Sequence, residues 1–124
     1  MNKILSGIVL AGLSSVFSFA YADDPAQVHK GMLVGPDQMT LYVFDKDVAG
    51  SGKSACNGPC AENWPPFAPA SESQPAGDFS IITRDDGSPQ WAYKGMPLYY
   101  WVKDKSPGDT TGDGVKGVWS VAKP

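Results

Sequence analysis

The chain has 124 residues, with 10 basic and 13 acidic side chains and a formal net charge of -3. This length fits one domain and excludes most large enzyme folds. The acidic balance argues against a nucleic-acid partner, because proteins that bind polyanions carry clustered Lys and Arg. The 14 Gly and 11 Pro predict a loop-rich domain whose core depends on Trp and Tyr side chains.

The first segment of the chain has the pattern of an export signal. Lys3 gives a positive start, residues 4–19 are mostly apolar, and residues 20–22 (Ala-Tyr-Ala) have the small-x-small pattern of a cleavage site. The apolar stretch is at the short end for a membrane span, and the acidic Asp23 follows it instead of basic residues. We expect cleavage after Ala22, which leaves a mature domain of residues 23–124 without a membrane span. We expect this domain in a bacterial periplasm or secreted from the cell.

The chain has two cysteines, Cys56 and Cys60, separated by Asn-Gly-Pro. An oxidising compartment favours a disulfide across this tight turn. The alternative is a metal or redox pair, because soft thiolates hold Cu(I) and His29, the single histidine, could complete such a site. The sequence favours the disulfide with no cofactor and keeps copper as the alternative.

An internal repeat organises the mature chain. Residues 39–47 recur at 96–104, and Met, Leu, Tyr, an aromatic residue, Lys and Asp match in register. The pattern predicts two degenerate repeats, at about 28–66 and 79–124, joined by a proline-rich connector. Because a unit of this size seldom buries its apolar face alone, we expect the two repeats to pack together as one domain.

Alternating side chains within the repeat predict β-strands. Tyr42 and Phe44 share one strand face, and Tyr99 and Trp101 share the corresponding face of the second copy. Further strands are expected at 28–34, 79–83, 90–93 and 118–122, and a short helical turn is expected at 61–63. The sequence thus predicts a mainly β domain of two antiparallel repeats, arranged as a meander with a sandwich- or barrel-like shape and Gly/Pro-rich loops.

Several acidic residues lie at turns. Asp47 and Asp104 end the two repeated strands, where a carboxylate can accept backbone N–H groups of the following turn. We favour this capping role over a ligand role. Together with Asp104, Asp109 and Asp113 lie in a Gly-rich loop whose carboxylates are ligands of the type that calcium accepts. Their spacing departs from an EF-hand, so a solvated turn is favoured and calcium stays open.

Two other patterns suggest chemistry that the sequence does not support. Residues 50–54 end like a phosphate-binding loop, but position 47 is Asp where that motif needs Gly, which argues against nucleotide binding. The sequence also offers no recognisable pair of a catalytic nucleophile and its general base, since His29 is the single imidazole. The sequence therefore favours a role without enzymatic activity.

Aromatic residues crowd positions 91–101. Exposed aromatic faces bind sugars, quinones or apolar partners. For Tyr42, Tyr99 and Trp101 we favour core packing instead, because a small domain with few Leu and Ile must fill itself with aromatic side chains.

The motifs together resemble a known family. Residues 42–47 and 99–104 both read Tyr-x-aromatic-x-x-Asp, and residues 54–66 read Ser-Ala-Cys-Asn-Gly-Pro-Cys-Ala-Glu-Asn-Trp-Pro-Pro. They are similar to a bacterial family of predicted secreted or lipid-anchored proteins that is named for this Tyr and Asp motif. This chain lacks the lipidated Cys of the lipoprotein members. The resemblance implies an extracytoplasmic repeat of unknown function and gives no reaction.

We therefore expect an exported, non-enzymatic β module that binds an unknown ligand and associates with the cell envelope. The alternative is a periplasmic copper or redox protein that uses Cys56 and Cys60.

Overall fold

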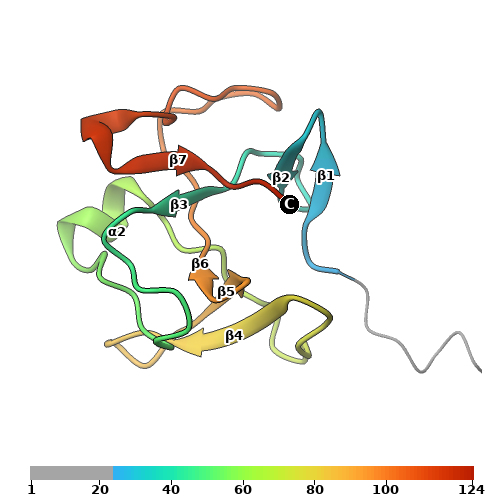
Figure 1. Cartoon of the computed structure of the whole chain (residues 1–124), viewed down its shortest axis with the longest axis vertical. Coiled ribbons are helices and arrows are strands. Elements are labelled where there is room, and N and C mark those ends of the chain that lie inside the picture. Colours follow the sequence, from blue (N-terminus) through green and yellow to red (C-terminus); the bar gives the residue numbers. More distant parts are fainter. Residues whose placement is uncertain (1–23) are drawn as a thin grey trace, which may run out of the picture.

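The computed structural model describes residues 24–124, so the expected export signal and its cleavage after Ala22 lie outside the described part. Figure 1 shows the arrangement of its short strands and helical turns. In chain order the elements are β1 (Gln27–His29), β2 (Met32–Val34), β3 (Tyr42–Phe44), α2 (Pro59–Asn63), β4 (Phe79–Thr83), β5 (Pro89–Tyr93), β6 (Met96–Pro97), the 3-10 turn η3 (Val115–Gly117) and β7 (Trp119–Val121).

The strands form three small antiparallel sheets, β1-β2, β3-β7 and β4-β5-β6. The mainly β prediction is confirmed, and the sheets of residues 24–124 do not close into a barrel. None of the helices in this part of the chain has the length and apolar character needed to cross a membrane.

The longest hairpin joins β4 to β5 and follows from its turn sequence. Arg84 N donates to Ser88 O at 2.8 Å, and the turn between them contains Gly87 at a φ of 87°. The side chain of Asp86 accepts from both Ser88 N and Ser88 Oγ, at 2.9 and 2.6 Å. Asp-Gly favours this turn, because glycine adopts positive φ without steric cost.

Two strand predictions were wrong in detail. The segment 28–34 is a hairpin and not one strand, because Lys30 and Gly31 both adopt positive φ and reverse the chain between β1 and β2. The second copy of the repeated strand is shorter than expected, since β6 ends at Pro97. Beyond it, Tyr99 pairs as isolated bridges with Tyr42 and Pro66.

The two repeats are interlaced. Strand β3 of the first repeat pairs with β7 at the end of the second, with Tyr42 opposite Val121 (Figure 1). In the same way, Tyr99 of the second repeat pairs with Pro66 at the end of the first. Tyr42 and Tyr99 also exchange both backbone hydrogen bonds, at 2.8 and 3.0 Å, so the pairing is reciprocal about a pseudo-twofold axis between them. Neither repeat completes its strand pairing alone.

The proline-rich segment that starts at Pro65 takes part in this pairing, although its sequence predicts a connector. Tyr100 N donates to Pro65 O at 2.8 Å, and Phe67 N donates to Leu98 O at 2.9 Å. A proline lacks a donor but keeps its carbonyl acceptor, so Pro65 can pair on the side where only an acceptor is needed. The true connector is therefore the later part of the segment, residues 68–78.

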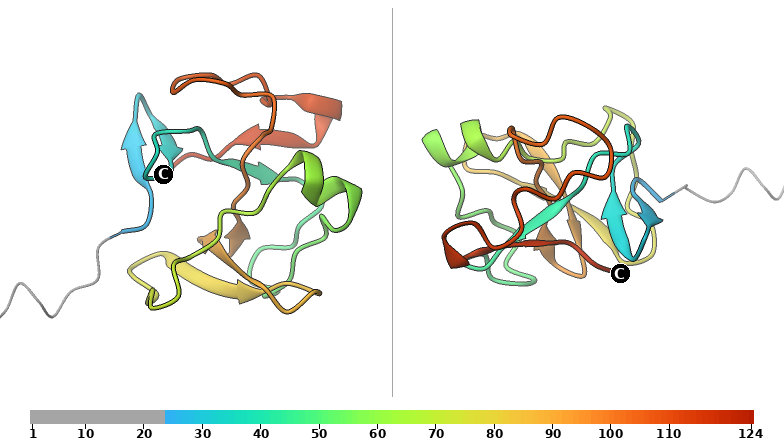
Figure 2. Two further views of the ribbon diagram at one scale, coloured as in Figure 1. Left: turned by 180° about the vertical axis from the view of Figure 1, so that it is seen from behind. Right: turned by 90° about the horizontal axis from the view of Figure 1, so that it is seen from above.

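Buried side chains divide into two clusters. The first contains Ala26, Leu33, Leu41, Phe67, Phe79, Trp91, Leu98 and Ala122. The second contains Tyr42, Phe44, Cys56, Trp64, Tyr99, Trp119 and Val121. Each cluster draws on both repeats, so the hydrophobic core forms only when the repeats are together. Figure 2 shows the chain wrapping around this centre from two further directions.

Interlacing predicts that the fold tolerates a cut in the connector. A protease recognition sequence inserted after Glu72, an exposed residue, should allow cleavage while the two fragments stay associated. Strand pairing and both core clusters join the fragments, and the Cys56–Cys60 bridge lies within one of them. Gel filtration and near-ultraviolet circular dichroism of the cleaved protein measure this, with the same sample in denaturant as the control. Separation under native conditions would contradict the interlaced arrangement.

Candidate functional site

The Tyr and Asp residues of the repeat motif form two reciprocal hydrogen bonds. Tyr42 Oη donates to Asp104 Oδ2 at 2.6 Å, and Tyr99 Oη donates to Asp47 Oδ2 at 2.6 Å. Each bond crosses from one repeat to the other. All four side chains are buried. The motif therefore joins the two repeats inside the protein, and its residues are not presented to solvent.

The same carboxylates also hold the loops that follow their strands. Asp47 Oδ1 accepts from Ala55 N at 2.6 Å, and Asp104 Oδ1 accepts from Thr111 N and Thr111 Oγ1 at 3.0 and 2.6 Å. Each Asp thus accepts backbone N–H donation from its own repeat and a phenol from the other. A short buried hydrogen bond to a charged acceptor is among the stronger ones in proteins.

The other loop carboxylates are also used by backbone donors. Asp109 Oδ2 accepts from Lys105 N at 2.8 Å and from Ser106 N at 3.0 Å, and Asp113 Oδ1 accepts from Val121 N at 3.1 Å. Within residues 24–124, His, Cys, Asp and Glu side chains form no group of three that could hold a metal ion.

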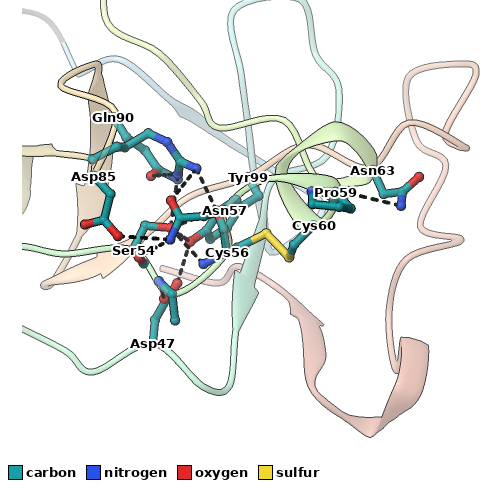
Figure 3. The surroundings of a disulfide bond; sticks show 12 residues. Asp47, Ser54, Cys56, Asn57, Pro59, Cys60, Asn63, Asp85, Gln90 and Tyr99 are labelled. Carbon is teal, nitrogen blue, oxygen red and sulfur yellow. Dashed lines mark hydrogen bonds between the residues drawn. A yellow bond between two sulfur atoms is a disulfide. The ribbon is translucent and has the colours of Figure 1, made fainter.

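Around Asp47 the two repeats differ, because a buried arginine enters from the β4-β5 hairpin. Arg84 Nη1 donates to Ser54 Oγ at 3.0 Å and to Gln90 Oε1 at 2.7 Å, and its Nη2 donates to Cys56 O at 2.6 Å (Figure 3). Ser54 Oγ lies 2.6 Å from Tyr99 Oη, which connects this network to the motif. Sequence pattern alone does not reveal the burial of Arg84, because a position just before Asp85-Asp86 is typical of an exposed turn.

Burial and hydrogen bonding shift several ionisations. Burial raises the pKa of Asp47, and the hydrogen bond from Tyr99 and the charge of Arg84 offset only part of this rise. Burial is also the main cause that raises the pKa of Tyr42 and Tyr99 well above the usual range, and their bonds to Asp carboxylates add to the rise. Both phenols therefore stay protonated as donors at neutral pH.

Cys56 and Cys60 form a disulfide, which confirms that prediction. The bridge joins the loop after Ser54 to the first turn of α2 (Figure 3). Trp64 N donates to Cys60 O at 2.8 Å at the end of that helix. In this form the sulfurs are not thiolates. His29 is exposed on β1, across the molecule from α2, so the structure does not bring it to the cysteines (Figures 1 and 2).

A stack of four aromatic rings runs between the repeats. Trp64 stacks on Trp101 at 3.9 Å and on Trp119 at 3.7 Å between ring centroids, and Trp119 stacks on Phe44 at 4.3 Å. We call Trp101, Trp64, Trp119 and Phe44 the aromatic stack. Its members come alternately from the second and the first repeat, so it follows the same pseudo-twofold axis. The rings of the stack cover each other's faces.

The motif tyrosines pack against this stack by their edges. Tyr42 lies 5.4 Å from Trp64 in a T-shaped arrangement, and Tyr99 lies 5.2 Å from Trp119 in the same way. Gly112 approaches this contact so closely that an added Cβ would lie 2.9 Å from both Tyr42 and Trp64. The motif thus fixes the position of the stack as well as the pairing of the repeats.

Three rings of the stack, Phe44, Trp64 and Trp119, border a pocket of about 350 Å³. We call it the aromatic pocket, and it is lined by Phe44, Lys46, Pro59, Cys60, Asn63, Trp64, Lys116, Val118 and Trp119. Its walls come from β3, α2, η3 and β7, so both repeats contribute to it. Its charged residues are both lysines. On another face of α2, Glu62, Asp85 and Asp86 line a second and more acidic pocket.

The remaining sequence candidates are dispersed. The aromatic residues of positions 91–101 divide between the two clusters, with Trp91 in the first and Tyr99 in the second, so they do not form one binding face. The phosphate-loop-like run packs on the connection after β5, where Gly50 N donates to Gly95 O at 3.0 Å, and the next helix starts only at Pro59.

Comparison with protein families decides the affiliation of the chain. Residues 26–68 and 80–123 each match a family described as a secreted repeat of unknown function. The chain belongs to this family. The match confirms two repeats in one chain, and the two matched segments correspond to the interlaced halves of the structure. No curated protein and no solved structure matches the chain.

The reciprocal bonds predict a matched loss of stability. Tyr42→Phe and Tyr99→Phe should each lower the free energy of unfolding by about 1–3 kcal/mol, because each leaves a buried carboxylate without one donor. Tyr93→Phe is the control, since Tyr93 is only partly buried and should change stability by about 0.5 kcal/mol or less. Urea unfolding followed by tryptophan fluorescence measures all three. A loss equal to that of the control would contradict the proposed role of the motif.

The raised phenol pKa values predict sensitivity to alkali. Burial raises the pKa of Tyr42, Tyr99 and Tyr100, with nearby Asp residues adding to each rise. Above the usual tyrosine pKa of about 10, the unfolded chain releases protons that the folded chain keeps, so stability falls as pH rises. Urea unfolding at several pH values above 9 tests this. Tyr100→Phe should reduce the slope, and a stability that does not change with pH would refute the burial effect.

Removal of the disulfide should weaken the fold without destroying it. Cys56→Ala/Cys60→Ala is expected to cost about 2 kcal/mol, because the closed loop is short and loop entropy grows slowly with length. Urea unfolding with and without the substitutions gives the difference. Complete unfolding of the variant at room temperature would show that the bridge contributes more than its loop length implies.

Proposed function

We propose that this secreted repeat protein is an exported, non-enzymatic binding module that associates with the cell envelope, and that the aromatic pocket is its binding site. The observation that carries the proposal is the composition of this pocket. Apolar and aromatic side chains form most of the lining, and a few polar groups, Lys46, Asn63 and Lys116, converge on it. This is the general pattern of small-ligand sites in proteins.

The rigidity of the pocket supports a binding role. Trp64 and Trp119 are 4% and 3% exposed and stack on each other, so one wall is fixed. The disulfide also fixes Cys60, in the first turn of α2, where it lines the pocket. A site that is formed before its ligand arrives loses less conformational entropy on binding.

The placement of the ionisable groups supports a role without catalysis. Asp47 and Asp104, the buried carboxylates, accept hydrogen bonds that hold the two repeats together. The polar groups of the aromatic pocket are two lysines and one asparagine, which do not supply a nucleophile with its base. Export and a pocket with positive charge together favour a component of the cell envelope as the partner.

The test is co-sedimentation of the mature protein with purified peptidoglycan sacculi. Val118 is partly buried and lines the pocket, so Val118→Trp should fill the pocket and prevent sedimentation. Val48→Trp is the matched control, because Val48 is 67% exposed and lies outside the pocket lining. Wild-type protein and this control should sediment with the sacculi.

Two outcomes would contradict the proposal. Failure of the wild-type protein to sediment would remove the envelope association. Equal sedimentation of Val118→Trp and wild type would place binding outside the aromatic pocket. Thiol titration of the same sample tests the copper alternative, since free thiols with bound copper would make Cys56 and Cys60 the active groups.

A further inference from the structure

We infer that the aromatic pocket selects an organic anion, with a carboxylate held by Lys46 and Lys116 and a ring lying against the apolar wall. This inference rests on the proposed function and names the ligand class for the same site.

The charge of the pocket is opposite to that of the protein. The chain carries a net charge of -3, yet the charged residues that line the aromatic pocket are Lys46 and Lys116. Both lysines are exposed, so their ammonium groups can reach a ligand at the mouth. Lys46 follows β3 of the first repeat and Lys116 lies in η3 of the second. A cleft lined by one sign of charge on apolar walls concentrates ions of the other sign.

The aromatic stack adds to this preference for anions, because stacking covers the ring faces and leaves ring edges free. Trp64 lies between Trp101 and Trp119, and Trp119 lies between Trp64 and Phe44, so both faces of these two indoles are covered. What Trp64 and Trp119 can present to the pocket is therefore a ring edge. An aromatic ring carries its negative charge on the face and its positive charge at the edge. The edges of these two indoles attract anions, whereas their faces, which would attract cations, are occupied by the neighbouring rings.

The helix α2 separates the aromatic pocket from the nearby acidic residues. Pro59, Cys60 and Asn63 contact the aromatic pocket, whereas Ala61 and Glu62 line the second pocket together with the acidic hairpin turn. The carboxylates of Glu62 and of the hairpin turn thus line the second pocket and not the aromatic pocket. An anion in the aromatic pocket meets two ammonium groups and the amide of Asn63 without a facing carboxylate in the lining.

The volume limits the size of the ligand. At about 350 Å³ the aromatic pocket is near the lower end of the range of about 300–1,000 Å³ for ligand sites. It can take a unit of one or two rings. A ring carboxylate of this size has two sources, a soluble aromatic acid or an acidic sugar of the envelope.

The experiment compares charged and uncharged probes of the same shape by NMR chemical-shift titration of the mature protein. The probes are 2-naphthoate with 2-naphthylmethanol, and glucuronate with glucose. At least one of the two anions should shift the signals of the aromatic pocket and bind about tenfold more tightly than its uncharged partner. Binding of naphthoate alone indicates an aromatic acid, and binding of glucuronate alone indicates an acidic sugar.

Charge-removing variants test the role of the lysines. Lys46→Gln and Lys116→Gln should each weaken binding of the anion about threefold to tenfold and leave binding of the uncharged partner unchanged. Lys53→Gln is the matched control, because Lys53 is exposed and lies outside the pocket lining, and it should bind like wild type. The unliganded spectrum of each variant reports whether its fold is intact.

Equal affinity for the charged and uncharged probes would overturn the inference and leave the proposed site intact. Absence of shifts at the pocket with all four probes would also overturn it. The proposed function would then still stand if sacculi retain the wild-type protein and release Val118→Trp, so the two failures are distinguishable.

Discussion

The hydrogen bonds between Tyr42 and Asp104 and between Tyr99 and Asp47 are the constraint on which the other features depend. They join opposite repeats across the pseudo-twofold axis, and the same side chains shape the two loops and pack against the aromatic stack. A buried phenol and carboxylate satisfy each other at low cost, because each would otherwise lose its hydration without a partner. In this chain the repeated Tyr and Asp residues therefore join the two repeats, and they are buried.

Departures from the symmetry show where the two repeats have specialised. The first repeat has the disulfide and Ser54, and it receives Arg84 from the second. The corresponding loop of the second repeat has Gly112, whose N–H donates to Tyr42 Oη at 3.2 Å. The aromatic pocket lies next to the disulfide, since Cys60 is part of its lining. A symmetric frame thus provides rigidity, and the asymmetric additions provide a distinct surface.

The sequence predicted the features that depend on local pattern and could not predict those that depend on distant pairing. Alternating side chains and turn residues predicted β4, and the disulfide was predicted from the expected compartment and the cysteine spacing. The hairpin turn at Lys30 was not predicted, because lysine rarely adopts positive φ. The burial of Arg84 and the exchange of strands between repeats arise from contacts tens of residues apart. Periodicity does not encode such contacts, so the aromatic pocket could not be found before the fold.

The exchange of strand partners between the two repeats also suggests how the architecture arose. A chain with a single repeat would carry a strand equivalent to β3 whose partner lies only in another copy, so it would be a homodimer with a true twofold axis. Duplication and fusion of its gene would join two such subunits through residues 68–78. Fusion then frees each position to evolve separately in the two copies, which accounts for a cysteine pair in one repeat alone.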